Sequence, residues 1–189
     1  DNAILFTAVA MLNQSPRGAW YVPALQASCL VAFVLLAPWV GPLADRRSKP
    51  QVLLIGNVLK GVGAALLFAG VEPLAAYALI GLGAAVYSPA KYGILPEIVG
   101  HDRLVRANSW MEGSTIVAIV PATVVGSRVA DYSVPLALSG VIVCYVASGA
   151  AALLLPPLVA VQRDAEANLA SFFGRIRTLF IGARARFSM

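Results

Sequence analysis

Charged residues are scarce in this sequence. Asp, Glu, Lys and Arg make up 12% of its 189 residues, whereas soluble domains average about 25%. Apolar residues make up 59%, and the mean hydropathy is +0.80. This composition leaves too little polar surface for a soluble enzyme or a nucleic-acid-binding module. It predicts a bundle of membrane-spanning helices.

Residues suited to metal or thiol chemistry are also few. Both cysteines, Cys29 and Cys144, stand in apolar stretches, which indicates small buried side chains. The one histidine, His101, stands in a polar loop beside Asp102 and is interpreted as a solvated loop residue. No spacing of these residues is typical of a metal site. We therefore predict no catalytic residue, no metal and no cofactor, and classify the chain as a non-enzyme.

Charge-free stretches divide the chain into membrane spans. Residues 18–44 and 74–90 contain no charged residue, and a helix needs about 20 apolar residues to cross a bilayer. The predicted helices cover residues 1–14, 19–44, 50–71, 74–95, 108–130 and 134–155. Together they make residues 1–157 an all-α, polytopic membrane bundle. Five of these spans are complete.

The first helix is expected to be truncated. Its apolar run of ten residues, 3–12, covers roughly half of a bilayer core. Asp1 and Asn2 should therefore lie near the membrane midplane. On this reasoning the chain is a fragment of a longer membrane protein.

Basic residues predict the orientation of the bundle. Arg47, Lys49, Lys91 and Arg103 belong to one set of connections, whereas Arg17 belongs to the opposite set. Cytoplasmic loops carry the excess of Lys and Arg, so the first set is expected in the cytoplasm. This asymmetry explains the net charge of +5 without a nucleic-acid partner.

Residues 158–189 are predicted to form a cytoplasmic amphipathic linker. Between residues 168 and 186 the apolar side chains recur at helical spacing on one face, and the arginines lie largely off it. Such a helix lies at the membrane surface and attracts anionic lipids. It is either a plain linker or a lipid-sensing segment.

Ionisable residues inside the spans are the candidate site. Asp1 and Lys60 are both expected near the midplane, and Asn57 lies three residues before Lys60 on the same helix face. A charge at that depth costs several kcal/mol unless it is paired or hydrated. Asp1, Asn2, Asn57 and Lys60 are therefore interpreted as lining a polar cavity for a charged or zwitterionic solute. The alternative is that they only hold helices together.

Lys91 and Glu112 stand near the inner ends of two spans. We predict that they form a charge pair at the inner rim. A gating role and a purely structural role are both open on the residues alone.

Residues 41–49, with the sequence GPLADRRSK, resemble the loop motif of the major facilitator superfamily. Ser48 replaces the second glycine of that motif. Gly41 permits close helix contact, while Asp45 can pair with a basic group or a helix N-terminus. The resemblance implies that Gly41, Asp45 and Arg46 belong to a conformational latch.

Longer stretches resemble the LplT-type lysophospholipid transporters of that superfamily. They are residues 1–6, 36–41, 87–97 (YSPAKYGILPE) and 104–116, so the likeness covers most of residues 1–130. It implies the six-helix N-terminal half of a major facilitator fold whose C-terminal six-helix half is missing. It also implies a flippase that moves lysophospholipids, such as lysophosphatidylethanolamine, from the outer to the inner leaflet of a bacterial inner membrane by alternating access.

The same resemblance suggests roles for the site residues. Asp1 would attract the ammonium of an ethanolamine headgroup or a base in the cavity, and Lys60 would bind the phosphate with Asn57 as a donor. Lys91 and Glu112 would change partners as the halves move. Two alternatives stay open: another solute or drug transporter of the superfamily, and a non-transporting bundle fused to a lipid acyltransferase.

Overall fold

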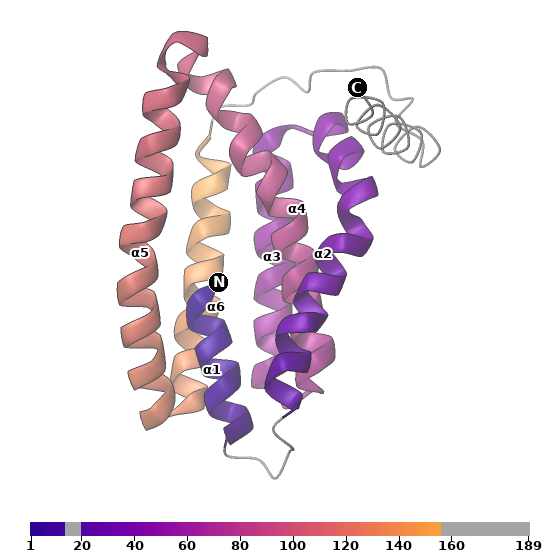
Figure 1. The fold of residues 1–189 in the computed structure, drawn as a ribbon, viewed down its shortest axis with the longest axis vertical. Helices are drawn as coiled ribbons and strands as arrows, with labels where there is room; N and C mark the ends of the chain where they lie inside the picture. The colour runs from indigo at the N-terminus through magenta and orange to yellow at the C-terminus, as the bar shows by residue number, and fades with distance from the viewer. Residues whose placement is uncertain (14–19, 156–189) are drawn as a thin grey trace, which may run out of the picture.

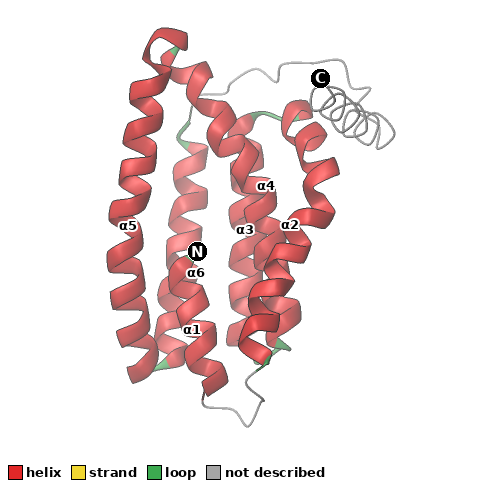
Figure 2. Cartoon of the chain, viewed as in Figure 1, coloured by secondary structure: helices red, strands yellow, loops and turns green. Residues whose placement is uncertain are grey.

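The structure, a computed structural model, describes residues 1–13 and 20–155, apart from the side chains of residues 37, 38, 41–46 and 101. All regular secondary structure in these residues is helical (Figure 2). The helices are α1 (Asn2–Asn13), α2 (Tyr21–Arg46), α3 (Lys49–Phe68), α4 (Pro73–Val99), η1 (His101–Arg103), α5 (Leu104–Tyr132) and α6 (Val134–Leu153). The predicted amphipathic linker at 158–189 lies outside the described residues.

The six α-helices form two groups that run along one long axis (Figure 1). Helices α2, α3 and α4 pack together, as do α1, α5 and α6, and contact between α3 and α6 joins the groups. The α2–α3 and α4–α5 connections share one end of the bundle. We call this the basic end because Arg47, Lys49 and Arg103 lie there. The other end, with the α3–α4 and α5–α6 connections, is the distal end.

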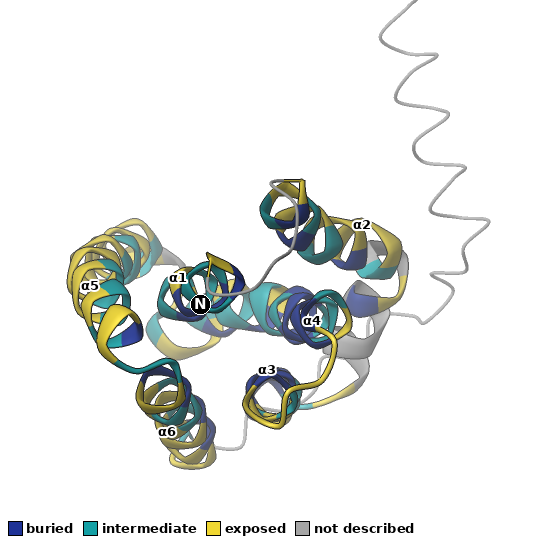
Figure 3. Cartoon of the chain, turned by 90° about the horizontal axis from the view of Figure 1, so that it is seen from below, coloured by how far each residue is buried: buried dark blue, intermediate teal, exposed yellow. Residues whose placement is uncertain are grey.

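Helices α3, α4, α5 and α6 are long and apolar enough to cross a membrane, and α1 and Tyr21–Leu36 are shorter apolar helices. This confirms the predicted all-α polytopic membrane protein. The outer surface agrees, since large apolar side chains such as Leu30, Val34 and Val117 are exposed over it (Figure 3). Helix α5 is the extreme case, because only 6% of its most apolar window is buried. Such a surface is suited to lipid rather than water.

Helix ends at the basic end differ from the sequence prediction. Helix α4, predicted to end at residue 95, continues to Val99, and α5, predicted to begin at residue 108, begins at Leu104, so most of the residues between the two predicted spans are helical. Likewise, α2 continues to Arg46, past the predicted end at residue 44, so Asp45 and Arg46 of the motif lie in a helix, as Gly41 does. Both predictions were wrong because a helix does not end where the apolar run ends. It continues through the headgroup region, which adds to the hydrocarbon thickness.

Glycines let α3 and α4 cross in backbone contact. A Cβ added to Gly83 would lie 2.7 Å from the Gly56 carbonyl oxygen and 2.9 Å from the Lys60 backbone nitrogen. A Cβ added to Gly56 would in turn lie 2.9 Å from the Gly83 carbonyl oxygen. Small residues are typical of such close crossings in membranes. This crossing presses Lys60 against α4 and so fixes the position of the candidate site.

Candidate functional site

The structure brings Asp1 and Lys60 together in the interior of the bundle. The Lys60 ammonium donates to Oδ2 of Asp1 at 2.9 Å, and the Tyr145 hydroxyl donates to Oδ1 of the same carboxylate at 2.9 Å. Lys60 lies in α3 and Tyr145 in α6, and Asp1 directly precedes α1. Asp1 lies about half-way along the length of α5 (Figure 1). The depth of Asp1 in a membrane stays a prediction.

Two aromatic rings complete the surroundings of Lys60. Its ammonium lies 4.4 Å from the centroid of the Tyr87 ring and 5.8 Å from that of Tyr145, within the range of cation–π attraction. The Lys60 side chain is 5% exposed, whereas that of Asp1 is 52% exposed. A buried ammonium is tolerated only with such partners. The Lys60 ammonium is the deeply buried member of the pair.

Asn57 and Asn2 complete the predicted cavity residues. Asn57 is buried one turn before Lys60, as the helical spacing predicts, and its Nδ2 atom has no hydrogen-bond partner in the described part of the chain. A buried amide nitrogen without a partner is costly, so it has an unused capacity to donate. Asn2 is half-buried in the first turn of α1.

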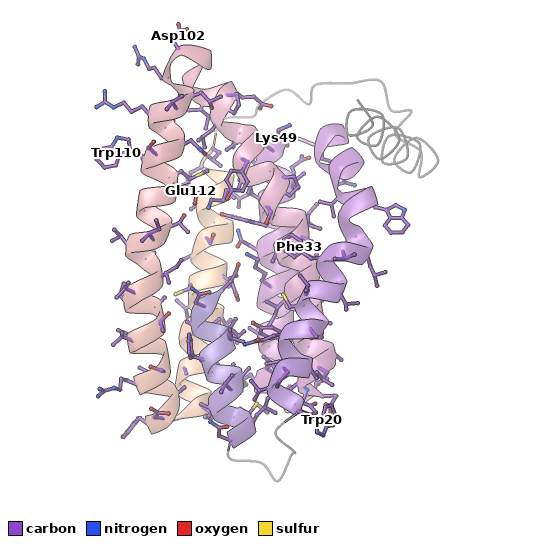
Figure 4. All side chains as sticks on the ribbon, in the orientation of Figure 1. Trp20, Phe33, Lys49, Asp102, Trp110 and Glu112 are labelled. Carbon is purple, nitrogen blue, oxygen red and sulfur yellow. The ribbon has the colours of Figure 1, made fainter. Side chains whose placement is uncertain are left out.

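At the inner rim, the predicted ion pair between Lys91 and Glu112 is not formed. The Lys91 ammonium instead donates to Oγ1 of Thr115 at 3.2 Å. Glu112 lies one turn before Thr115 on α5 and points toward the interior (Figure 4). Its Oε1 is buried without a hydrogen-bond partner among the described residues, and the Tyr92 side chain lies beside it. Lys91 is thus bound to Thr115, which lies one turn from Glu112 on α5.

A second ion pair closes the basic end. The Lys49 ammonium at the start of α3 lies 3.3 Å from Oε1 of Glu97 in α4. The lysine stem crosses Gly93, where an added Cβ would lie 3.0 Å from Cε of Lys49. The sequence interpretation did not find this pair. Lys49 belongs to the same motif as Gly41, Asp45 and Arg46. The side chains of residues 41–46 are outside the described ones, so the predicted latch stays a prediction.

Tyr145, Tyr87 and Thr115 were also missed, although each contacts a predicted site residue. The signal for Tyr145 and Tyr87 was a hydroxyl inside an apolar span, because such a group needs a partner when buried. Thr115 carried no such signal, since threonine in a membrane helix commonly bonds its own backbone, as Thr115 also does with the Met111 carbonyl oxygen at 2.8 Å. In the described part of the chain, no group of His, Cys, Asp and Glu could hold a metal ion.

Comparison with known proteins shows which transporters this chain is similar to. The chain is 43% identical over its full length to the lysophospholipid transporter LplT of Cronobacter sakazakii, of which it covers 49%. It is 42% identical to the LplT proteins of Photorhabdus laumondii and Salmonella paratyphi B, covering 48% of each. Over its full length the chain is similar to the LplT lysophospholipid transporters. This confirms the resemblance seen in the sequence motifs.

The chain spans about half the length of the curated LplT relatives it matches. No protein-family profile and no solved structure matches it. Because the match to LplT includes every residue of the chain, it includes the whole of the Asp1–Lys60–Tyr145 cluster and the inner rim.

Proposed function

We propose that this chain forms one half of a lysophospholipid transporter, with the arrangement of a major facilitator protein and a second six-helix half completing the cavity. The observation that carries the proposal is the Asp1–Lys60–Tyr145 cluster, an ion pair inside a membrane bundle. Ionisable groups at that depth are expensive to maintain and are typical of substrate pathways. The names of the LplT relatives supply the substrate class.

The cluster suits a zwitterionic headgroup. Lysophosphatidylethanolamine carries an ammonium and a phosphate, which match the signs of Asp1 and Lys60. When it binds, the internal ion pair is replaced by two ion pairs with the substrate, so no buried charge loses its partner. Asn57, whose amide nitrogen has no partner, supplies a further donor for the phosphate. The free energy lost with the internal ion pair is therefore close to the free energy gained from the two ion pairs with the substrate, as reversible binding requires.

The inner rim provides a second step of the transport cycle. Lys91 contacts Thr115 in this structure, and Glu112 offers an alternative acceptor one turn away. Movement of the ammonium from Thr115 to Glu112 would accompany the change between outward and inward access. In that cycle the headgroup passes from Lys60 to Lys91 as the inner rim opens.

The basic residues support an orientation of the bundle in the membrane. The basic end faces the cytoplasm by the positive-inside rule, so inward movement carries lysophospholipid to the inner leaflet of a bacterial inner membrane. Re-acylation there by an acyltransferase would consume the product.

Reconstitution tests the proposal. The full-length natural protein is placed in vesicles whose outer leaflet contains fluorescent lysophosphatidylethanolamine, and internalisation is followed as the fraction that albumin no longer extracts. We expect internalisation well above that of protein-free vesicles. A rate equal to that of protein-free vesicles would contradict the proposed function.

A further inference from the structure

A groove between α1, α5 and α6 begins at the Asp1–Lys60–Tyr145 cluster. Its volume is about 340 Å³. Asp1 and Tyr145 stand at one end, and most of the remaining lining is apolar, including Ile4, Val125 and Leu136. Thr7 also lines it, but its hydroxyl already donates to the Ala3 carbonyl oxygen at 2.8 Å. The groove is thus polar at one end and apolar along its length.

The groove runs from mid-bundle toward the distal end. Its lining residues follow α6 from Tyr145 back to Leu136, which is nine residues, or about 14 Å of helix at about 1.5 Å per residue. The hydrocarbon core of a bilayer is about 30 Å thick, so this length matches about one leaflet. A molecule with its charged group at Asp1 would therefore have one leaflet's depth of apolar groove for its tail.

Small residues give the groove its depth. A Cβ added to Gly140 meets no other atom within 4 Å, so the space in front of it is open. Gly126 differs, because a Cβ there would lie 3.1 Å from the Ala3 Cα and is excluded by the packing of α1 on α5. Gly140 therefore contributes to the open volume, whereas Gly126 serves helix packing.

We propose that this groove binds the single acyl tail of the lysophospholipid while its headgroup contacts Asp1. The inference rests on the proposed function and adds a tail site to it. Charge complementarity selects this occupant, since the Asp1 carboxylate stands at the end where the apolar lining begins and attracts an ammonium group. The groove, defined by residues of this half alone, sets the preferred tail length.

The test fills the groove without disturbing the fold. In the full-length protein, Gly140→Leu places a side chain in open space, and Gly113→Leu is the matched control. Gly113 is also a helical glycine whose added Cβ meets no atom within 4 Å, but it does not line the groove. We expect Gly140→Leu to lower transport of long-chain lysophosphatidylethanolamine by about tenfold and to spare a short-chain analogue. Gly113→Leu should leave the chain-length profile unchanged.

An unchanged profile in Gly140→Leu, or an equal loss for both chain lengths, would overturn the tail site. A second measurement depends on binding alone, so it remains decisive if the wild-type protein proves not to transport. Lysophosphatidylethanolamine with a photoreactive group at the tail end should label Val129 or Leu136 in the purified full-length protein. Labelling elsewhere would overturn the proposal, as would equal labelling by a diacyl lipid or a cross-link between two copies of the chain at this groove.

Discussion

Replacing Gly83 with alanine should separate α3 from α4 and weaken the site at the same time. The new methyl group would lie 2.7 Å from the Gly56 carbonyl oxygen and 2.9 Å from the Lys60 backbone nitrogen. Both are atoms of the α3 backbone, which cannot rotate aside as a flexible side chain can. The two helices must therefore move apart, and Lys60 moves with α3 relative to its Tyr87 contact.

The magnitude follows from two opposing terms. Overpacking a tight contact costs about 1–3 kcal/mol, whereas glycine to alanine in a helix interior gains up to about 1 kcal/mol. We expect a net loss of about 0–2 kcal/mol in the free energy of unfolding for Gly83→Ala, which is about 1–3 kcal/mol relative to an alanine that enters open space. Gly113→Ala is the matched control, because its methyl group enters open space and pays no packing cost.

The assay is denaturant unfolding of the purified full-length protein in detergent, followed by circular dichroism. Lysophospholipid transport is measured on the same preparations. Gly83→Ala should unfold at a lower denaturant concentration than Gly113→Ala and transport more slowly. If Gly83→Ala were as stable as the control and fully active, the reasoning about the α3–α4 crossing would be refuted.

Three further predictions concern the charged residues. Lys60→Met should lower the free energy of unfolding by about 1–3 kcal/mol, a smaller loss than for an ion pair with both partners fully buried, because Asp1 is half exposed. Adding Asp1→Asn to Lys60→Met should recover part of that loss in the same unfolding assay. Glu97→Gln removes the negative charge opposite the partly buried Lys49 ammonium and should lower the free energy of unfolding by about 1–2 kcal/mol. A decrease in the stability of the wild-type protein with added salt would support this. Thr115→Val removes the acceptor of the Lys91 ammonium and should slow transport while changing the free energy of unfolding by only about 1 kcal/mol; unchanged transport would contradict a role for this contact.

Counting residues along the helices was enough to place Asp1 and Lys60 at similar depth. The ten-residue apolar run sets the depth of Asp1, and the distance from the start of its span sets that of Lys60. The shared face of Asn57 and Lys60 followed from helical periodicity, and both residues are buried. These features depend on one helix at a time, so the sequence contains them.

The remaining site features depend on how helices meet. Tyr145 reaches Asp1 because α6 packs against α3 and α1, and sequence spacing has no information on that contact. Lys91 contacts Thr115 and not Glu112, although both lie on the same side of α5, because the relative shift of α4 and α5 decides which turn is nearest. Helix ends were misjudged for a related reason, since polar residues such as Glu97 extend a helix beyond the hydrocarbon.

The central claim is that the Asp1 carboxylate, paired with Lys60 inside the bundle, serves lysophospholipid transport. Asp1→Asn in the full-length protein tests it most directly, with Asp131→Asn as the control because Asp131 is an exposed carboxylate at the distal end of α5. The measurement is lysophosphatidylethanolamine internalisation by reconstituted vesicles at matched protein content. We predict a loss of about tenfold or more for Asp1→Asn and wild-type transport for Asp131→Asn. Wild-type transport by Asp1→Asn, from correctly folded protein, would contradict the account.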